Sequence, residues 1–211
     1  MKLYTYWRST AAYRVRIALN LKGVARQDVF VSLIEGAHTA PAYTDRNPQA
    51  LVPMLELPDG AVLSQSLAIL DWLEATHPDP PLLPEAALPR ARALELAHVI
   101  AMDIHPVNNL RVVTALSDRF GADGAAKRDW MQHWMRLGFD AIEPRLTGTP
   151  YALPGDRPGL ADCCLIPQVY NARRWGLDMT PWPKITAVET ACLALPAFAD
   201  AAPEAQPDAD R

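Results

Sequence analysis

The chain has 211 residues, of which half are hydrophobic and 21% are charged, with a net charge of −4. The apolar fraction excludes a disordered chain, and the lack of a basic excess excludes a generic nucleic-acid binder. No apolar run approaches the roughly 18 residues of a membrane-spanning helix, and residues 1–7 lack the apolar stretch of a signal peptide. The length suits two small domains, and we expect no membrane segment.

Cysteine and histidine usage predicts neither a disulfide framework nor a metal site. Cys163 and Cys164 are adjacent and Cys192 stands alone, which matches no zinc-binding spacing. The five histidines are scattered and form no H-E-x-x-H pair. We therefore expect reduced, mostly buried thiols, no metal, and a cytoplasmic protein.

The first eighty residues alternate short strands with helices. Alternating β-forming residues indicate strands, a Pro58-Asp59-Gly60 turn indicates a hairpin, and apolar residues at helical spacing indicate the helices. The order β-α-β-(short α)-β-β-α predicts a mixed sheet with helices packed against it. The predicted elements are strands over 2–6, 27–33, 54–57 and 61–63, and helices over 15–21 and 66–75.

Four prolines within residues 78–84 mark a break in the chain, because neither a helix interior nor a central strand accommodates them. Strand signals stop after this point. We therefore expect a domain over 1–77, a proline-rich linker over 78–89, an all-helical domain over 90–202, and a poorly ordered tail over 203–211. The predicted helices of the second domain cover 90–116, 125–146, 160–175 and 185–195.

Ser9 and Thr10 stand where the first strand ends and a helix begins. Free backbone N–H groups and the positive end of the helix dipole favour an anion at such a point. A hydroxyl there can donate to a thiolate and lower the pKa of the thiol. The alternative is an ordinary helix cap, for which serine and threonine are the usual residues.

Two further segments suggest peptide binding. A cis bond between Val52 and Pro53, at the head of the third strand, would turn the Val52 backbone toward a ligand, and a trans proline is the alternative. Gln65 and Ser66 directly precede a helix, where a hydroxyl and free amides can hold a carboxylate. Here too a simple cap is the alternative.

In this order, and followed by a helical half, these segments resemble the cytosolic glutathione transferases. Within them the chain resembles the zeta class, which includes the maleylacetoacetate and maleylpyruvate isomerases. The resemblance implies an α/β thioredoxin-like N-terminal domain that binds glutathione and an all-α C-terminal domain that completes the substrate site. It also implies a homodimer. The matching stretches lie in 6–19, 47–53, 65–66, 103–109, 160–162 and 178–183, and the resemblance covers about residues 3–207.

The resemblance implies a role for each matching residue. Ser9 corresponds to the family's activating serine, with Thr10 as its neighbouring hydroxyl. Val52, with Pro53 after it, corresponds to the residue whose backbone pairs with the cysteinyl part of glutathione, and Gln65–Ser66 to the pair that holds the γ-glutamyl group. The positions that reach the glycyl end or the second-domain side are His38, Gln49, His105 and Asn108.

Arginines are expected to bind the substrate, because a dianion needs local positive charge in a protein of net charge −4. The candidates are Arg8, beside the activating serine, and Arg174, where zeta-class enzymes keep an arginine at the substrate pocket. Arg111 is a third candidate and favours maleylpyruvate, because the maleylpyruvate branch carries arginine there and many maleylacetoacetate members carry serine.

For every arginine the alternative is a solvated surface position. This applies most to Arg14 and Arg16, which lie two apart on one helix and so face different ways.

The activity implied is a glutathione-dependent cis–trans isomerisation of a small dicarboxylic keto acid, maleylacetoacetate or maleylpyruvate, to its fumaryl isomer in aromatic catabolism. A general glutathione transferase acting on electrophiles or α-halo acids is the nearest alternative, because the same Ser9 chemistry would serve it. A non-enzymatic binding module is a further alternative. Loss of Ser9, Gln65 or Ser66 would favour the binding module, and all three are present.

Two positions depart from the family's pattern. Ala11 stands where zeta-class members often have a cysteine, which argues against reductive dehalogenation of hydroquinones. Gly159 stands where many glutathione transferases have a serine or threonine cap, although the Asp162 half of that capping box is present. Glycine is a tolerable cap, so we expect little effect.

Overall fold

The computed structural model describes residues 1–209 and divides the chain into two compact units. The first consists of Met1–Leu82 together with the residues from Leu193 onward, and the second is Leu83–Cys192. The N-terminal boundary lies within the predicted proline-rich linker. The C-terminal boundary does not follow the prediction, because the last segment of the chain belongs to the first unit.

The first unit contains a four-stranded sheet in the order β2-β1-β3-β4. β1 runs parallel to β2 and antiparallel to β3, which is antiparallel to β4, so the predicted mixed thioredoxin-like sheet is confirmed. The strands are β1 (Lys2–Thr5), β2 (Gln27–Phe30), β3 (Met54–Glu56) and β4 (Val62–Ser64).

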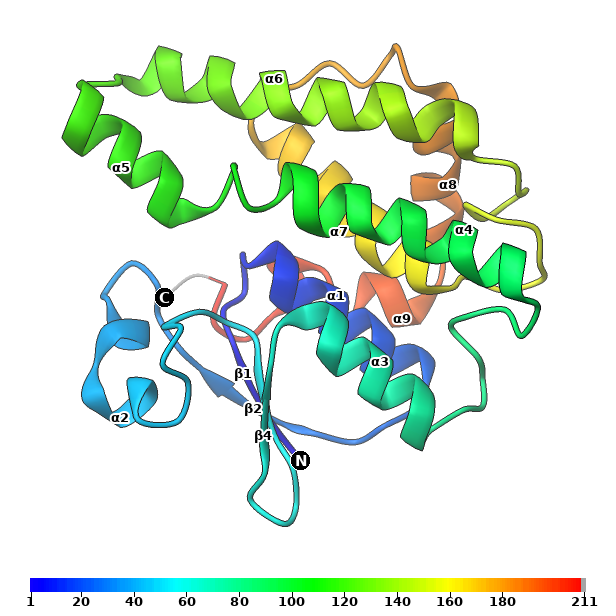
Figure 1. The fold of residues 1–211 in the computed structure, drawn as a ribbon, viewed down its shortest axis with the longest axis horizontal. Helices are drawn as coiled ribbons and strands as arrows, with labels where there is room; N and C mark the ends of the chain where they lie inside the picture. Colours follow the sequence, from blue (N-terminus) through cyan, green and yellow to red (C-terminus); the bar gives the residue numbers. More distant parts are fainter. Residues whose placement is uncertain (210–211) are drawn as a thin grey trace. The chain divides into compact units, whose positions relative to one another are not determined.

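Both faces of this sheet are covered. Leu3 and Leu55 are direct partners in the sheet and have no exposed surface. The next residue, Met54, points to the opposite face, where it packs in a cluster with Tyr43. Figure 1 shows α1 and α3 together on one side of the sheet, away from α2. The helical segments of this part are α1 (Thr10–Leu21), η1 (Ala37–Thr39), α2 (Pro41–Thr44) and α3 (Ser66–Thr76).

The second unit is helical, as predicted. Its central helix is α7, in which every residue from Leu160 to Val169 is buried. The elements are α4 (Ala87–His98), a π-helical turn (Val99–Ile104), α5 (Leu110–Phe120), α6 (Gly124–Ile142), η3 (Glu143–Arg145), α7 (Leu160–Arg174) and α8 (Pro183–Leu193).

The predicted continuous helix over 90–116 is wrong, because the chain breaks between α4 and α5. Pro106 offers no N–H for a helical hydrogen bond. Asn109 then starts a new helix, since its side chain accepts the N–H of Arg111 at 3.2 Å. The turn between them is held by Asn108, whose amide donates to the Met131 carbonyl of α6 at 3.3 Å.

The expectation of a poorly ordered tail over 203–211 is wrong for residues 203–209, while 210 and 211 lie outside the described residues. The chain after α8 forms α9 (Pro196–Ala199) and η4 (Pro203–Ala205) and returns to α1. Tyr13 donates to the Phe198 carbonyl at 3.3 Å, and Asn20 donates to the Ala197 carbonyl at 3.0 Å. Buried apolar side chains and these bonds offset the entropy of ordering a segment rich in alanine and proline.

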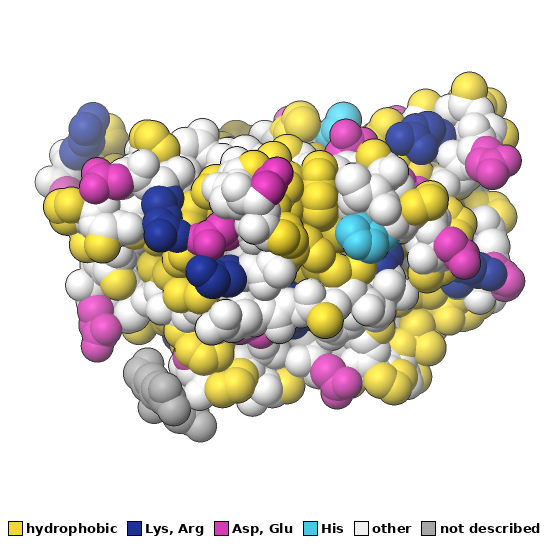
Figure 2. Space-filling view, turned by 90° about the horizontal axis from the view of Figure 1, so that it is seen from below, with side chains coloured by type: hydrophobic (Ala, Val, Ile, Leu, Met, Phe, Trp, Pro, Cys, Tyr) yellow, Lys and Arg dark blue, Asp and Glu magenta, His cyan; other side chains and the backbone are white. Residues whose placement is uncertain are grey.

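Between residues 1 and 209, no helix is both long and apolar enough to cross a membrane. On the face shown in Figure 2, Lys and Arg alternate with Asp and Glu, in keeping with a nearly balanced charge.

Candidate active site

Ser9 is the N-cap of α1, as the sequence suggested. Its Oγ accepts the N–H of Ala12 at 3.2 Å, and its own N–H donates to the Tyr6 carbonyl at 3.0 Å. Because Oγ serves as an acceptor in the cap, its hydrogen remains able to donate to a ligand. The helix therefore begins five residues before the predicted start at 15. The cap and the thiol-activating role are compatible, since they use different parts of one hydroxyl.

The two neighbours of Ser9 differ in accessibility. Thr10 is the first residue of α1 and is buried. Arg8 is half-buried, and its guanidinium carbon lies 5.0 Å from the centre of the Trp7 ring. Stacking on an aromatic face restricts the direction in which this cation points.

The Val52–Pro53 peptide bond is cis. Within the described chain, the backbone N–H of Val52 makes no hydrogen bond to other backbone. The carbonyl just before it, that of Leu51, accepts from the Asn47 amide at 2.7 Å and from the Tyr43 hydroxyl at 2.5 Å. Burial raises the pKa of Tyr43, so this phenol stays a donor at neutral pH.

The start of α3 has no side-chain cap, contrary to the simple alternative. Gln65 precedes it with φ 71°, a backbone conformation that costs a non-glycine residue free energy and is often kept at functional sites. Its side chain donates to Oε1 of Gln49 at 2.8 Å. Ser66 accepts from Nη1 of the buried Arg14 at 3.2 Å. Amides without a side-chain cap, at a serine that contacts a buried cation, favour a carboxylate here.

The register of the sheet brings these three segments to one edge. Tyr4, Met54 and Ser64 are neighbours across β1, β3 and β4. At this edge the chain leaves β1 toward Ser9, enters β3 from Val52–Pro53, and leaves β4 directly into α3. The Ser9 hydroxyl, the Val52 backbone and the start of α3 thus lie together.

His38 lies in η1, half-buried, with Nδ1 enclosed and without a hydrogen-bond partner among the described residues. Among residues 1–209 it makes no hydrogen bond to another predicted site residue, in contrast to the Gln49–Gln65 pair.

The remaining predicted residues belong to the second unit, and their roles there stay predictions. Asn108 is buried and ties its turn to α6, while Oδ1 of its amide is enclosed without a partner within the described chain. His105 is half-buried and its carbonyl accepts the N–H of Asn108. Arg111 is exposed on the first turn of α5. Arg174 ends α7, where it donates to Oδ1 of Asn171 at 3.3 Å and stacks on the ring of Trp175.

Sequence reasoning missed two buried arginines. Arg14 is 1% exposed and Arg16 is 0% exposed, so the surface interpretation is wrong for both. Burial is the largest cause that lowers the pKa of Arg16, to about 10, which still leaves it charged at neutral pH. The signal was present, because both interrupt the otherwise apolar run from Ala11 to Leu19.

A family model for the glutathione S-transferase N-terminal domain matches residues 8–76. A maleylpyruvate isomerase from Ralstonia sp is 49% identical over 99% of this chain and 99% of its own length. A maleylacetoacetate isomerase from Rhizobium meliloti is 48% identical over 96% of this chain and 95% of its own.

Solved structures that are similar to this chain belong to the same family as these relatives. A holo structure of a zeta-class maleylpyruvate isomerase superposes with a TM-score of 0.95, at 49% identity and 99% coverage of both chains. A maleylacetoacetate isomerase from Methylobacterium extorquens, with malonate and glutathione bound, gives a TM-score of 0.95 at 40% identity and full coverage of both chains.

Proposed function

Because this chain belongs to the maleylacetoacetate and maleylpyruvate isomerase family of zeta-class glutathione transferases, we propose that it isomerises a maleyl keto acid to its fumaryl form with glutathione. The observation that carries this proposal is the meeting of Ser9, Val52 and the start of α3 at one edge of the sheet.

The residues at this edge fit glutathione part by part. The uncapped start of α3, where Ser66 contacts the buried Arg14, suits the γ-glutamyl carboxylate, and Gln65 can donate or accept beside it. The open N–H of Val52 suits the cysteinyl backbone. Ser9 and the α1 N-terminus suit the thiolate. Gln49 and His38 are the residues that we assign to the glycyl end of glutathione.

When bound, glutathione supplies a thiolate that adds reversibly to the cis double bond, so that the bond rotates before the sulfur leaves. The chain's own contribution is to lower the pKa of that thiol through the Ser9 hydroxyl and the helix dipole. Arg8, Arg111 and Arg174 hold the substrate carboxylates and stabilise charge on the keto oxygen as it develops. His105 and Asn108 complete the second-domain side of the site. Arg111 favours maleylpyruvate as the substrate.

The first test compares wild type with Ser9→Ala. We expect glutathione-dependent loss of maleylpyruvate or maleylacetoacetate absorbance, with kcat about 100-fold lower in the variant, since one charge-stabilising donor is removed. Ser32→Ala is a matched control, because Oγ of Ser32 also accepts an N–H three residues on, from Glu35 at 3.2 Å. The control should keep full activity.

If the protein turns over neither acid and instead conjugates glutathione to a chloroarene electrophile, the isomerase proposal is contradicted and a general glutathione transferase is supported. Two further properties belong to the proposal. We expect a homodimer in sedimentation velocity, as in the family. We also expect the enzyme to work in the cytoplasm, where glutathione and the three free buried cysteines stay reduced.

A further inference from the structure

The last residues of the chain contact the loop that leads to Ser9. Oδ2 of Asp208 accepts the backbone N–H of Trp7 at 3.0 Å, although the two residues are 201 positions apart. Asp208 is 6% exposed, and its other oxygen, Oδ1, is enclosed without a hydrogen-bond partner within residues 1–209. A buried carboxylate that accepts a backbone N–H makes a charge-assisted bond, which is stronger than a neutral one.

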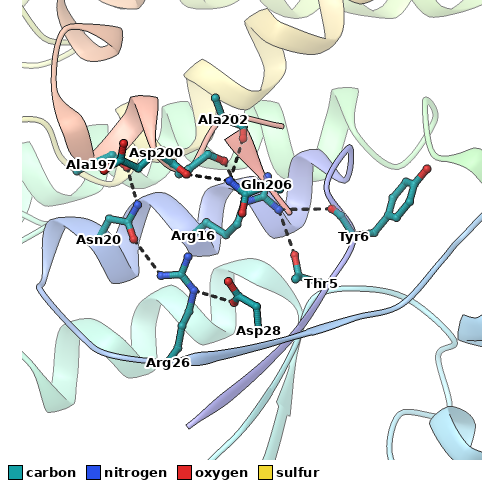
Figure 3. Close-up of polar contacts among 11 residues, drawn as sticks. Thr5, Tyr6, Arg16, Asn20, Arg26, Asp28, Ala197, Asp200, Ala202 and Gln206 are labelled. Carbon is teal, nitrogen blue, oxygen red and sulfur yellow. Dashed lines mark hydrogen bonds and ion pairs between the residues drawn. The ribbon is translucent and has the colours of Figure 1, made fainter. Parts of the chain in front are cut away.

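A second contact reinforces the first. Arg16, fully buried in α1, donates from Nε to the Ala201 carbonyl at 3.0 Å and from Nη1 to Oγ1 of Thr5 at 3.1 Å. The same guanidinium donates to the carbonyls of Tyr6 at 3.4 Å and Trp7 at 2.9 Å. Figure 3 shows Arg16 between the C-terminal segment and the residues that follow β1. One rigid cation therefore fixes two successive peptide groups directly before Arg8 and Ser9.

The C-terminal segment is itself held in shape. Nε2 of Gln206 donates to the carbonyls of Asp200 at 2.8 Å and Ala202 at 2.9 Å, and Pro203 is buried. The segment thus returns Asp208 to the loop in a defined position. The negative charge of Asp208 also favours the charged form of Arg16, opposing part of the cost of burying that cation.

We propose that Asp208 is a positioning residue for Ser9, and that the docked C-terminal segment sets the Ser9 hydroxyl for thiol activation. The inference rests on the proposed role of Ser9. Asp208 fixes the N–H of Trp7, Arg16 fixes the carbonyls on either side of that N–H, and the N–H of Ser9 donates to one of those same carbonyls, that of Tyr6. A displacement of about 1 Å at such a point can cost about 100-fold in rate.

The test uses Asp208→Ala in the full chain. We expect kcat to fall about tenfold and the pH midpoint of thiolate absorbance of bound glutathione to rise. The glutathione Kd should stay unchanged at a pH low enough to keep the bound thiol protonated. Asp208→Asn should recover most of both losses, because its amide oxygen can still accept the Trp7 N–H. Asp200→Ala is the matched control, because this exposed aspartate of the same segment accepts from Gln206 through its backbone carbonyl and not through its carboxylate.

A merely structural role predicts another result: Asp208→Ala would lower the urea midpoint of unfolding and leave the thiolate titration of the folded enzyme unchanged. That result overturns the inference. In the double variant Ser9→Ala/Asp208→Ala, the second substitution should cost almost nothing further, because both act through one hydroxyl. Full activity of Ser9→Ala alone overturns the role of Ser9 and this inference together. An impaired Ser9→Ala beside a wild-type-like Asp208→Ala overturns only the inference.

Discussion

The side chain of Asn47 holds the loop over residues 47–51, which leads to Val52, with two hydrogen bonds. Its Nδ2 donates to the Leu51 carbonyl at 2.7 Å, and its Oδ1 accepts the N–H of Gln49 at 3.3 Å. It is 2% exposed, so neither bond is exchanged for water without cost. The residue is a scaffold for Val52 and would be overlooked in a search for ligand contacts alone.

We expect Asn47→Ala to raise the glutathione Kd about tenfold and to lower the free energy of unfolding by about 1–3 kcal/mol, since it removes one donor from the Leu51 carbonyl and the acceptor of the Gln49 N–H. Calorimetric binding and urea unfolding measure the two effects. Asp59→Ala removes a comparable side-chain-to-backbone bond, to the N–H of Ala61 at 3.0 Å, in the hairpin turn. It should leave binding intact. An unchanged Kd in Asn47→Ala would contradict the scaffold role.

At the scale of elements, the central strands carry a polar network that fixes their pairing. Lys2 and Glu56 are direct partners across β1 and β3, and their side chains form an ion pair at 2.9 Å. Tyr4 donates to the other oxygen of Glu56 at 2.9 Å, and Arg46 pairs with the same carboxylate. The hydrogen bond from Lys2, followed by that from Tyr4, holds the pKa of Glu56 below its ordinary value of 4.5.

This shift has a defined sign in a pH series. Because the folded pKa of Glu56 is below the unfolded one, its contribution to stability is complete above pH 4.5 and is lost as pH falls through the lower folded value. We expect Glu56→Gln to melt below wild type at pH 7, and the gap in Tm to close on acidification below pH 4.5. Glu35→Gln, at an exposed site, should show no such gap. A difference in Tm between wild type and Glu56→Gln that stays constant with pH would contradict this role of the ionised Glu56 carboxylate.

The helices and strands also show which structural features can be predicted from the sequence. Apolar period and turn residues place the sheet and most helices, because these signals act over a few residues. The capping box of α7 was readable too, and the structure confirms that Asp162 accepts the N–H of Gly159 at 2.9 Å. The break between α4 and α5 was not predicted, because the apolar period continues across it. There Pro106 prevents a continuous helix and Asn109 begins the next one.

At the scale of the whole molecule, the last segment of the chain, from Leu193 onward, belongs to the same compact unit as Met1–Leu82. Phe198 of α9 has no exposed surface, and its carbonyl accepts from Tyr13 of α1. Stability of the thioredoxin-like unit therefore depends on residues that follow the entire helical unit in sequence.

We expect Phe198→Ala to lower the free energy of unfolding by about 3–5 kcal/mol through cavity formation. Phe120→Ala, at a side chain that is 78% exposed, should change it by less than about 0.5 kcal/mol. Urea unfolding of both variants measures the difference. Equal, small effects would show that the C-terminal segment adds little to the first unit.

The sequence by itself determined the sheet and most of the helices, the division near the proline cluster and the candidate Ser9, Val52 and Gln65–Ser66 segments, because caps, turns and periodicity are local. The tertiary structure decided which distant groups satisfy the buried polar atoms. Arg14 meets Ser66 across 52 positions, and Trp7 meets Asp208 across 201. A buried donor must find an acceptor wherever the fold provides one, and no local pattern in the chain specifies that partner.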